Sequence, residues 1–99
     1  MTYNAVVDIR FYIDPESGRP HIHRHGVLED EVAAVLERPH EDRPGKEGSR
    51  VAVGRTRAGR WLRVIYVPDP APRSIFVITA YELGPKAKRA IRRRHRKKK

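Results

Sequence analysis

The sequence predicts an α+β domain: a four-stranded, mainly antiparallel sheet with helices packed on one face. Three runs rich in Val, Ile, Tyr, Phe and Trp, at 50–56, 60–67 and 74–81, follow one another and are bracketed by turn residues. Consecutive strands joined by short loops usually pair antiparallel, so these runs predict a three-stranded meander. An apolar run at 3–13 supplies one N-terminal strand, and residues 27–38 carry apolar side chains at helical spacing.

The segment before the main helix is expected to hold a turn and one short helical turn. Residues 14–18 (DPESG) have the composition of a turn. Gly26 is suited to end a helical turn formed by the preceding residues, because glycine readily adopts the left-handed conformation found there.

Residues 27–38 give the clearest helix signal in the chain. Acidic residues at 29–31 occupy the first turn, where the helix dipole favours negative charge, and Pro39 marks the end. Residues 40–48 (HEDRPGKEG) are polar and contain Pro and Gly, so an exposed loop is expected there. The apolar stripe consists of Val27, Leu28, Val32, Val35 and Leu36.

The meander has two distinct connections. Arg57-Ala58-Gly59 is a short hairpin turn, and the proline-rich segment 68–73 can only be a loop. Side-chain alternation then assigns residues to faces. In the second strand one face carries Arg60, Leu62, Val64 and Tyr66, and the other carries Trp61, Arg63, Ile65 and Val67. In the third strand one face carries Ile75, Val77, Thr79 and Tyr81. Both faces are partly apolar, so these strands are expected to be central.

The C-terminal segment is expected to form a basic helix that begins at Pro85. Ten of the 22 Lys and Arg residues lie at 86–99, without a single acidic residue, so this segment supplies the whole net charge of +10. A block of like charge at a terminus typically binds polyanions, here nucleic acid or the ribosome. The alternative is a solvated tail that aids solubility. The residues assigned to nucleic-acid binding are Lys86, Lys88, Arg89, Arg92 and Arg93.

Length and composition narrow the class of protein. The 99 residues predict a single domain, with a neutral α+β core at 1–85 and the basic segment at 86–99. There is no cysteine, which excludes disulfides and thiolate zinc sites and suits a cytoplasmic protein. No signal peptide, membrane span or cofactor is expected, and phosphate-loop and Gly-x-Ser-x-Gly motifs are absent.

Three alternating histidines, His21, His23 and His25, precede the main helix. No second ligand cluster lies at a familiar zinc spacing, so no metal is assigned. Imidazole titrates near neutral pH, so one of these rings can serve as a base or contact a phosphate. Three surface histidines beside a turn are the other interpretation. His25 is a catalytic candidate, and His21 and His23 are candidate nucleic-acid contacts.

Arginines and tyrosines of the meander complete a set of groups for RNA chemistry. The planar guanidinium stays charged and binds two phosphate oxygens, and Tyr66 and Tyr81 can stack on a base or donate a proton. Metal-free RNA cleavage requires a base for the 2′-hydroxyl, a cation for the phosphorane and an acid for the 5′-oxygen. Equally, Tyr66 suits a core, and an arginine at a hairpin tip is ordinarily solvated. The arginines are Arg50, Arg55, Arg57, Arg60 and Arg63, of which Arg57 and Arg63 are assigned to nucleic-acid binding.

Several short motifs occur in the order found in one known family. They are Arg24-His25-Gly26-Val27 before an acidic helix, Val53-Gly54-Arg55 with Gly59-Arg60, Val64-Ile65-Tyr66, and Ile78-Thr79-Ala80. They resemble the Lys-His-Gly-Val, Gly-Arg hairpin, apolar-plus-Tyr strand and Ile-Ser-Ala of BrnT-type toxins. These are small proteins of bacterial type II toxin–antitoxin modules with a RelE-like fold. The resemblance covers roughly residues 14–94.

The resemblance implies an RNA-cleaving toxin, a metal-independent endoribonuclease that acts on mRNA, free or on the ribosome, and inhibits translation. It also implies a cognate antitoxin protein as partner, in a hetero-oligomer or with the toxin as a homodimer. Carried over by position, its active-site residues are Arg24, Arg55, Arg60 and Tyr66, and His25 and Tyr81 complete the catalytic candidates.

This chain departs from the family pattern at two places. Tyr81 stands where the family commonly has arginine, and His21 and His23 stand where members often have asparagine and a basic residue. The ending Ile-Thr-Ala-Tyr resembles uncharacterised relatives of the same fold. A non-catalytic RNA- or ribosome-binding protein of this fold is therefore the alternative, and a protein-interaction module is a third hypothesis.

Overall fold

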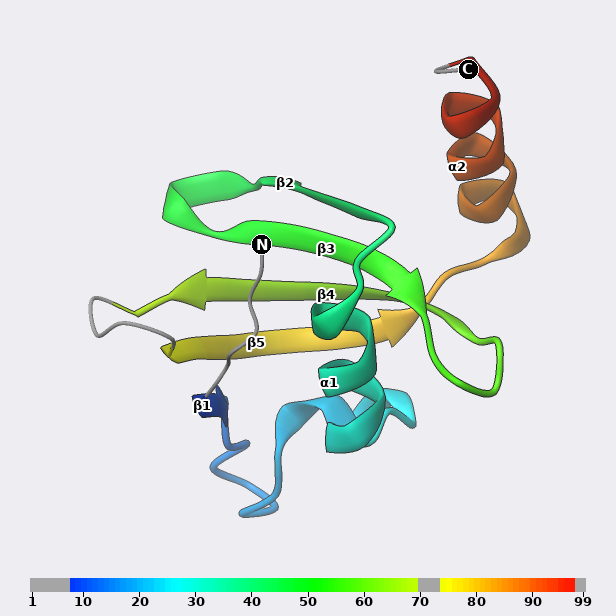
Figure 1. The fold of residues 1–99 in the computed structure, drawn as a ribbon. Coiled ribbons are helices and arrows are strands. Elements are labelled where there is room, and N and C mark those ends of the chain that lie inside the picture. Colours follow the sequence, from blue (N-terminus) through cyan, green and yellow to red (C-terminus); the bar gives the residue numbers. More distant parts are fainter. Residues whose placement is uncertain (1–7, 70–73, 98–99) are drawn as a thin grey trace.

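The computed structural model describes residues 8–69 and 74–97, which build a five-stranded mixed sheet with two α-helices (Figure 1). The strands lie in the order β1-β5-β4-β3-β2. Their bounds are β1 Asp8–Phe11, β2 Glu41–Pro44, β3 Arg50–Arg55, β4 Trp61–Pro68 and β5 Ser74–Glu82. The helices are α1 Glu29–Glu37 and α2 Pro85–Lys97, and two 3-10 helices are η1 His21–His25 and η2 Lys46–Gly48.

The α+β class, the main helix, the basic C-terminal helix and the meander are confirmed. β3, β4 and β5 occupy the predicted runs and pair antiparallel in sequence order, which places them in the interior of the sheet. α1 begins with three acids, and Glu31 accepts a 3.0 Å hydrogen bond from the backbone N–H of Leu28. That hydrogen bond satisfies one of the free donors at the helix start.

The expectation of four strands is wrong, because β2 forms inside the segment 40–48, for which the sequence predicts a loop. β2 pairs antiparallel with β3, from Glu41 opposite Val53 to Pro44 opposite Arg50. An edge strand has one neighbour and faces solvent, so it needs no apolar alternation. Pro44 at its end has no N–H to leave unpaired. The polar sequence of residues 40–48 therefore gives no indication of the strand that forms there.

β1 makes the sheet mixed rather than antiparallel throughout. It pairs parallel with β5, with Asp8 opposite Ser74 and Phe11 opposite Val77. A parallel pair requires a long crossover, and here the chain between β1 and β5 contains η1, α1 and three strands. The predicted strand spans 3–13, and residues 3–7 of this range lie outside the described part of the chain.

Helices contact both faces of the sheet, whereas the sequence predicts them on one. α1 and η1 cover the first face, where the main core contains Ile22, Val32, Leu62 and Val64. α2 follows the end of β5 (Figure 1). Its Ile91 packs on the second face, in a smaller cluster with Val53, Leu83, Val51, Trp61 and Ala87. Neither described helix is long and apolar enough to cross a membrane.

A bulge in β5 changes the face to which its last residues point. The register shifts between Ile65 and Tyr66 of β4, so that Ile78 has no partner of its own. Strict alternation places Val77 and Tyr81 on one face. With the bulge, Val77 and Ala80 both lie in the main core, and Tyr81 points to the opposite face.

Glycine allows α1 to pack closely on β3. A Cβ built at Gly54 would lie 3.2 Å from Cγ1 of Val35 and 3.5 Å from the backbone nitrogen of His40. A side chain there would push α1 away from the sheet, so Gly54 fixes how closely the helix and the strand approach.

Candidate nucleic-acid site on the open sheet face

Much of the second face of the sheet has no helix over it within the described residues. α2 covers only the end that holds Val51, Val53 and Trp61. We call the remainder the open face. It carries Arg10, Arg63, Ile65, Val67, Phe76, Thr79 and Tyr81, as the strand registers show.

Arginine side chains lie over aromatic rings at three places on this side of the sheet. The distances from guanidinium carbon to ring centroid are between 5.4 and 5.9 Å, within the range of a cation–π interaction. The ring and the charge together suit single-stranded RNA, which offers unpaired bases and phosphates. The pairs are Arg10–Phe76, Arg55–Trp61 and Arg63–Tyr81.

His21, His25, Arg63 and Tyr81 form a row at one border of the open face. The rings of His25 and Tyr81 meet edge-on with centroids 6.0 Å apart, and those of His21 and His25 with centroids 5.3 Å apart. Nη1 of Arg63 lies 3.5 Å from the Tyr81 hydroxyl. Two imidazoles, a phenol and a guanidinium thus lie side by side. These group types transfer protons and bind phosphate.

The local fold places η1 where this row requires it. The backbone N–H of Tyr12 donates to the carbonyl of Val77 at 2.9 Å, after which the chain turns away. The last part of β5 therefore pairs with β4 but has no strand neighbour on the side of β1. η1 fills that position. Ile22, 1% exposed, anchors η1 in the main core, and Gly26, at φ 69°, ends it.

Arg24 does not point toward the row. Its Nε lies 2.6 Å from Oδ2 of Asp14, and its Nη2 lies 3.0 Å from Oε1 of Glu16. The resemblance implies a place for Arg24 in the active site. In the structure, this guanidinium is occupied by two carboxylates of the preceding turn.

His23 is also turned away from the neighbouring histidines. Its Nε2 lies 2.8 Å from Oε1 of Glu29, at the start of α1. The hydrogen bond with His23 lowers the pKa of Glu29, because it stabilises the ionised carboxylate. His23 therefore joins η1 to α1, and only His21 and His25 of the three histidines face the open side.

Arg60 lies on the covered face of the sheet. Its Nη1 is 3.0 and 2.9 Å from the two carboxylate oxygens of Glu31 and 3.2 Å from the carbonyl of Gly26, and its Nη2 is 3.4 Å from Glu82. These interactions join α1 to β4 and β5. The structure gives Arg60 structural partners and separates it from Arg63 by the thickness of the sheet.

Tyr66, another catalytic candidate, is a core residue. It is 8% exposed, and its hydroxyl donates a 2.7 Å hydrogen bond to Oδ2 of Asp42. Burial, with the hydrogen bond to Asp42 and the charge of that carboxylate, raises the pKa of Tyr66 to about 12. Tyr66 and Tyr81 project from opposite faces, so they do not share one site.

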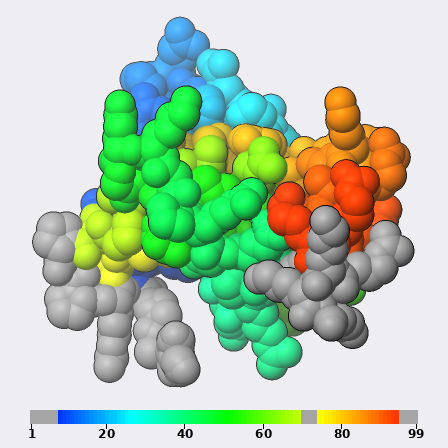
Figure 2. All heavy atoms as spheres, turned by 90° about the horizontal axis from the view of Figure 1, so that it is seen from above, coloured from blue at the N-terminus to red at the C-terminus, as the bar shows by residue number. Residues whose placement is uncertain are grey.

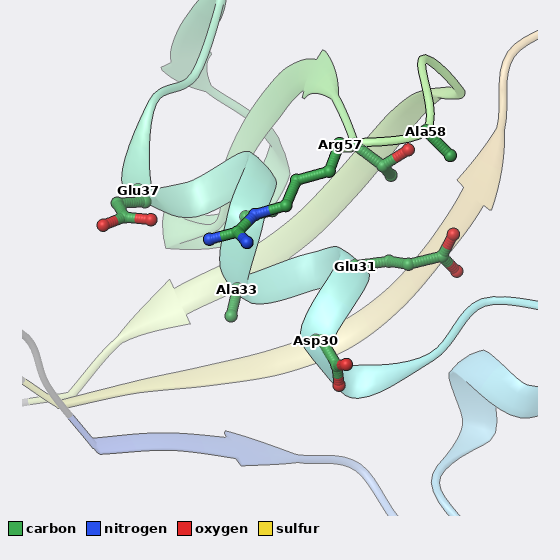
Figure 3. A pocket seen from close by; sticks show the side chains of 8 residues that line it. Asp30, Glu31, Ala33, Glu37, Arg57 and Ala58 are labelled. Atoms are coloured by element: carbon green, nitrogen blue, oxygen red, sulfur yellow. The ribbon is translucent and has the colours of Figure 1, made fainter.

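Arg57 lies at the hairpin between β3 and β4, beside a hollow on the covered side of the molecule. Figure 3 shows its side chain extending over α1, the helix that covers the first face of the sheet. The hollow is lined by Asp30, Glu31, Ala33, Ala34, Glu37, Thr56, Arg57 and Ala58. Its acidic residues do not suit a polyanion.

The basic residues assigned to nucleic acid lie along α2. This helix forms one end of the molecule, in orange to red in Figure 2. Lys86, Arg89, Arg92 and Arg93 are exposed and Lys88 is partly exposed. Arg94 instead donates two hydrogen bonds to Glu41, at 2.8 and 2.9 Å, which tether α2 to β2.

No group of three His, Asp or Glu side chains that could hold a metal ion occurs in residues 8–69 and 74–97. The alternating histidines diverge in η1, because the rings of a tight helix do not share one face as they would in a strand. The row at the border of the open face presents imidazole, phenol and guanidinium groups.

Two residues of the open face and its border, Asp14 and Arg10, are not predicted from the sequence as site residues. Asp14 has the sequence context of a simple turn residue, but its side chain lies between His21 and Arg24. Arg10 joins the open face because β1 pairs with β5. The turn at 14–18 signals that the chain reverses, but nothing local indicates which side chain its carboxylate meets.

Comparison with known proteins identifies a family to which the chain belongs. No curated protein and no solved structure matches the chain. A family model described as "Domain of unknown function (DUF4258)" matches residues 19–82, the span from just before η1 to the end of β5. The match includes His21, His25, Arg63 and Tyr81, and it leaves Asp14 and α2 outside. Because it covers more than half of the sequence, the chain belongs to the DUF4258 family.

Proposed function

We propose that the protein is a metal-independent endoribonuclease, of the translation-inhibiting toxin kind that its sequence resembles, and that RNA binds on the open face. The observation that carries this proposal is the convergence of His25, Arg63 and Tyr81. They come from η1, β4 and β5. The ring centroids of His25 and Tyr81 are 6.0 Å apart, and Nη1 of Arg63 lies 3.5 Å from the Tyr81 hydroxyl.

The three groups match the needs of RNA cleavage. Arg63 binds the phosphate and stabilises the negative charge that develops on it, because a guanidinium stays charged and offers several N–H donors. An imidazole accepts the proton of the 2′-hydroxyl, and a second proton carrier returns one to the departing 5′-oxygen. Tyr81, whose hydroxyl lies beside the Arg63 guanidinium, is positioned for that second role.

The surroundings supply RNA affinity. Arg55–Trp61 and Arg10–Phe76 extend the line of charged and aromatic groups on either side of Arg63, and the Arg10 guanidinium is also paired with Asp69. α2 adds exposed positive charge at one end, and each phosphate it neutralises releases counterions. A cognate antitoxin would then have to cover a basic face, which favours an acidic protein partner.

The alternative is an RNA-binding protein that does not cleave. The same arginine–aromatic pairs favour it, because binding to phosphates and bases needs no proton transfer. The two hypotheses differ in one respect: only the nuclease depends on the row of His21, His25 and Tyr81 for proton transfer.

Expression in a bacterial host tests the proposal. Wild type, His25→Ala, Arg63→Ala and Tyr81→Phe are induced beside Arg38→Ala, an exposed arginine at the end of α1 that serves as the matched control. The nuclease predicts growth arrest and RNA degradation for wild type and the control, and loss of both in the three site variants at equal soluble protein. Soluble wild-type protein without growth arrest or RNA degradation would contradict it and leave the binding protein.

A further inference from the structure

Asp14 is a buried carboxylate beside the row of rings. The residue is 7% exposed, in contrast to its exposed neighbours in the turn. Its Oδ2 lies 2.6 Å from Nε of Arg24 and 3.5 Å from Nδ1 of His21, and its Oδ1 accepts a 3.3 Å hydrogen bond from the backbone N–H of Glu16. Both oxygens of this carboxylate thus face a donor.

These donors keep Asp14 ionised. Burial alone would raise the pKa of Asp14, but the backbone hydrogen bond from Glu16 and the positive charge of Arg24 outweigh it and hold the pKa below its usual value. The carboxylate is therefore available to His21 as an acceptor at neutral pH.

Backbone hydrogen bonds fix the relation between Asp14 and His21. The N–H of His21 donates to the carbonyl of Tyr12 at 2.9 Å, and the N–H of Asp14 donates to the carbonyl of Arg19 at 2.8 Å. The two segments run side by side, so the imidazole and the carboxylate are held together by the turn that joins them.

This arrangement presents the other nitrogen of His21 to the open side. Nδ1 faces Asp14, which favours the tautomer with hydrogen on Nδ1 and leaves Nε2 free to accept a proton. Within the described residues Nε2 makes no hydrogen bond, and the next ring is His25, with centroids 5.3 Å apart. A carboxylate that orients a histidine for proton transfer is a recurrent catalytic device.

We infer that His21 is the general base of the open-face site and that Asp14 is the positioning residue that orients it. This inference rests on the proposed nuclease function. Nε2 of His21 removes the proton of the ribose 2′-hydroxyl, the 2′-oxygen forms a bond to phosphorus, and the bond from phosphorus to the 5′-oxygen breaks. Tyr81 gives its proton to the 5′-oxygen, so the products are a 2′,3′-cyclic phosphate and a 5′-hydroxyl.

Arg24 acquires a different role from the one that the resemblance implies. Its guanidinium forms ion pairs with Asp14 and Glu16 rather than with RNA phosphates. Its replacement is expected to act through the orientation of His21 and not through RNA affinity.

The first test is single-turnover cleavage of a single-stranded RNA oligonucleotide by the purified full-length chain. His21→Ala is expected to reduce the rate by roughly 100-fold or more, with partial rescue by added imidazole, and Asp14→Asn by roughly 10-fold or more. Arg38→Ala, at an exposed arginine at the end of α1, is the control and keeps the wild-type rate. Wild-type cleavage that survives in His21→Ala while His25→Ala loses it would overturn the inference and leave the proposed function intact.

The second test needs no activity. Nitrogen-15 NMR of the imidazoles is expected to show the Nδ1–H tautomer of neutral His21 in wild type and its loss in Asp14→Asn, with other amide resonances unchanged. An unchanged His21 tautomer in a folded Asp14→Asn would overturn the positioning role. If wild type shows this tautomer but cleaves no RNA, the proposed function fails while the pairing of Asp14 with His21 stands.

Discussion

The hydroxyl of Tyr66 donates a 2.7 Å hydrogen bond to Oδ2 of Asp42, and this bond ties the edge strand β2 to the centre of the sheet. Arg50 lies 3.0 Å from the other oxygen of the same carboxylate. Tyr66 is therefore occupied in holding the fold, on the face opposite to Tyr81.

Tyr66→Phe is expected to destabilise the protein without affecting RNA cleavage. The substitution keeps the ring and removes one hydrogen bond to a charged acceptor, which costs about 1–2 kcal/mol. Urea unfolding measures the loss of stability. Tyr81→Phe is the matched variant, and it is expected to keep nearly the wild-type stability and to lose cleavage. If Tyr66→Phe lost cleavage while Tyr81→Phe kept it, Tyr66 and not Tyr81 would belong to the active site.

The ionisation of Tyr66 should be visible at high pH. Its pKa is raised to about 12 in the folded chain, so the stability that its neutral form contributes is present below the ordinary tyrosine pKa and is lost as pH rises through about 12. Absorbance titration of wild type and Tyr66→Phe isolates this group by difference. A difference curve centred near the ordinary tyrosine pKa of about 10 would contradict the burial of Tyr66 and its hydrogen bond to Asp42.

Low pH should weaken the interaction between β1 and the β4–β5 loop. Hydrogen bonds from Arg10 and Ser74 lower the pKa of Asp69, so its contribution to stability is present above the ordinary carboxyl pKa and is lost as pH falls through the lowered value. Asp69→Asn is expected to be less stable than wild type at neutral pH, with the gap closing in strong acid. A gap that stays constant in thermal unfolding across this range would exclude the linkage.

Arg60→Ala is expected to act on stability rather than on chemistry. It removes the interactions with Glu31, Glu82 and the carbonyl of Gly26, and the loss is about 1–2 kcal/mol because these groups are only partly buried. Arg57→Ala, at the hairpin tip, is the control with little effect on either property. Folded Arg60→Ala protein that binds RNA normally but fails to cleave it would contradict this assignment.

Positive charge on α2 should set the salt dependence of RNA binding. Replacing Lys86, Arg89, Arg92 and Arg93 with glutamine is expected to lower affinity for all RNA sequences alike. The slope of log affinity against log salt should fall by about 0.7 for each phosphate that the variant no longer neutralises. Fluorescence anisotropy at several salt concentrations measures this slope. An unchanged slope would assign α2 to solubility alone.

The sequence predicts the parts of this fold that bury apolar side chains. The three runs of the meander form the main core with Val27, Val32, Val35 and Leu36 of the predicted apolar stripe, because their inward side chains pack against one another. Leu28 of that stripe is instead 57% exposed, so its assignment to the buried face is wrong. β2 is not predicted, because an edge strand such as Glu41–Pro44 is held in place by its pairing with β3 and has no apolar alternation of its own.

The candidate site is less predictable for a different reason. Residue types suggest His25, Arg63 and Tyr81, but the bulge at Ile78 decides that Tyr81 points to the open face. The partners of Arg24 and Arg60 depend on which carboxylates the tertiary fold brings near. Sequence spacing alone does not fix either of these arrangements.

The most direct test of the proposed nuclease is the product of the reaction with purified protein in the presence of EDTA. A single-stranded RNA oligonucleotide is compared with one carrying a single 2′-deoxynucleotide at the cleavage position. We expect cleavage of the first to a 2′,3′-cyclic phosphate and a 5′-hydroxyl, and no cleavage of the second at that position. Equal cleavage of both, or intact RNA with folded wild-type protein, would contradict the proposed nuclease.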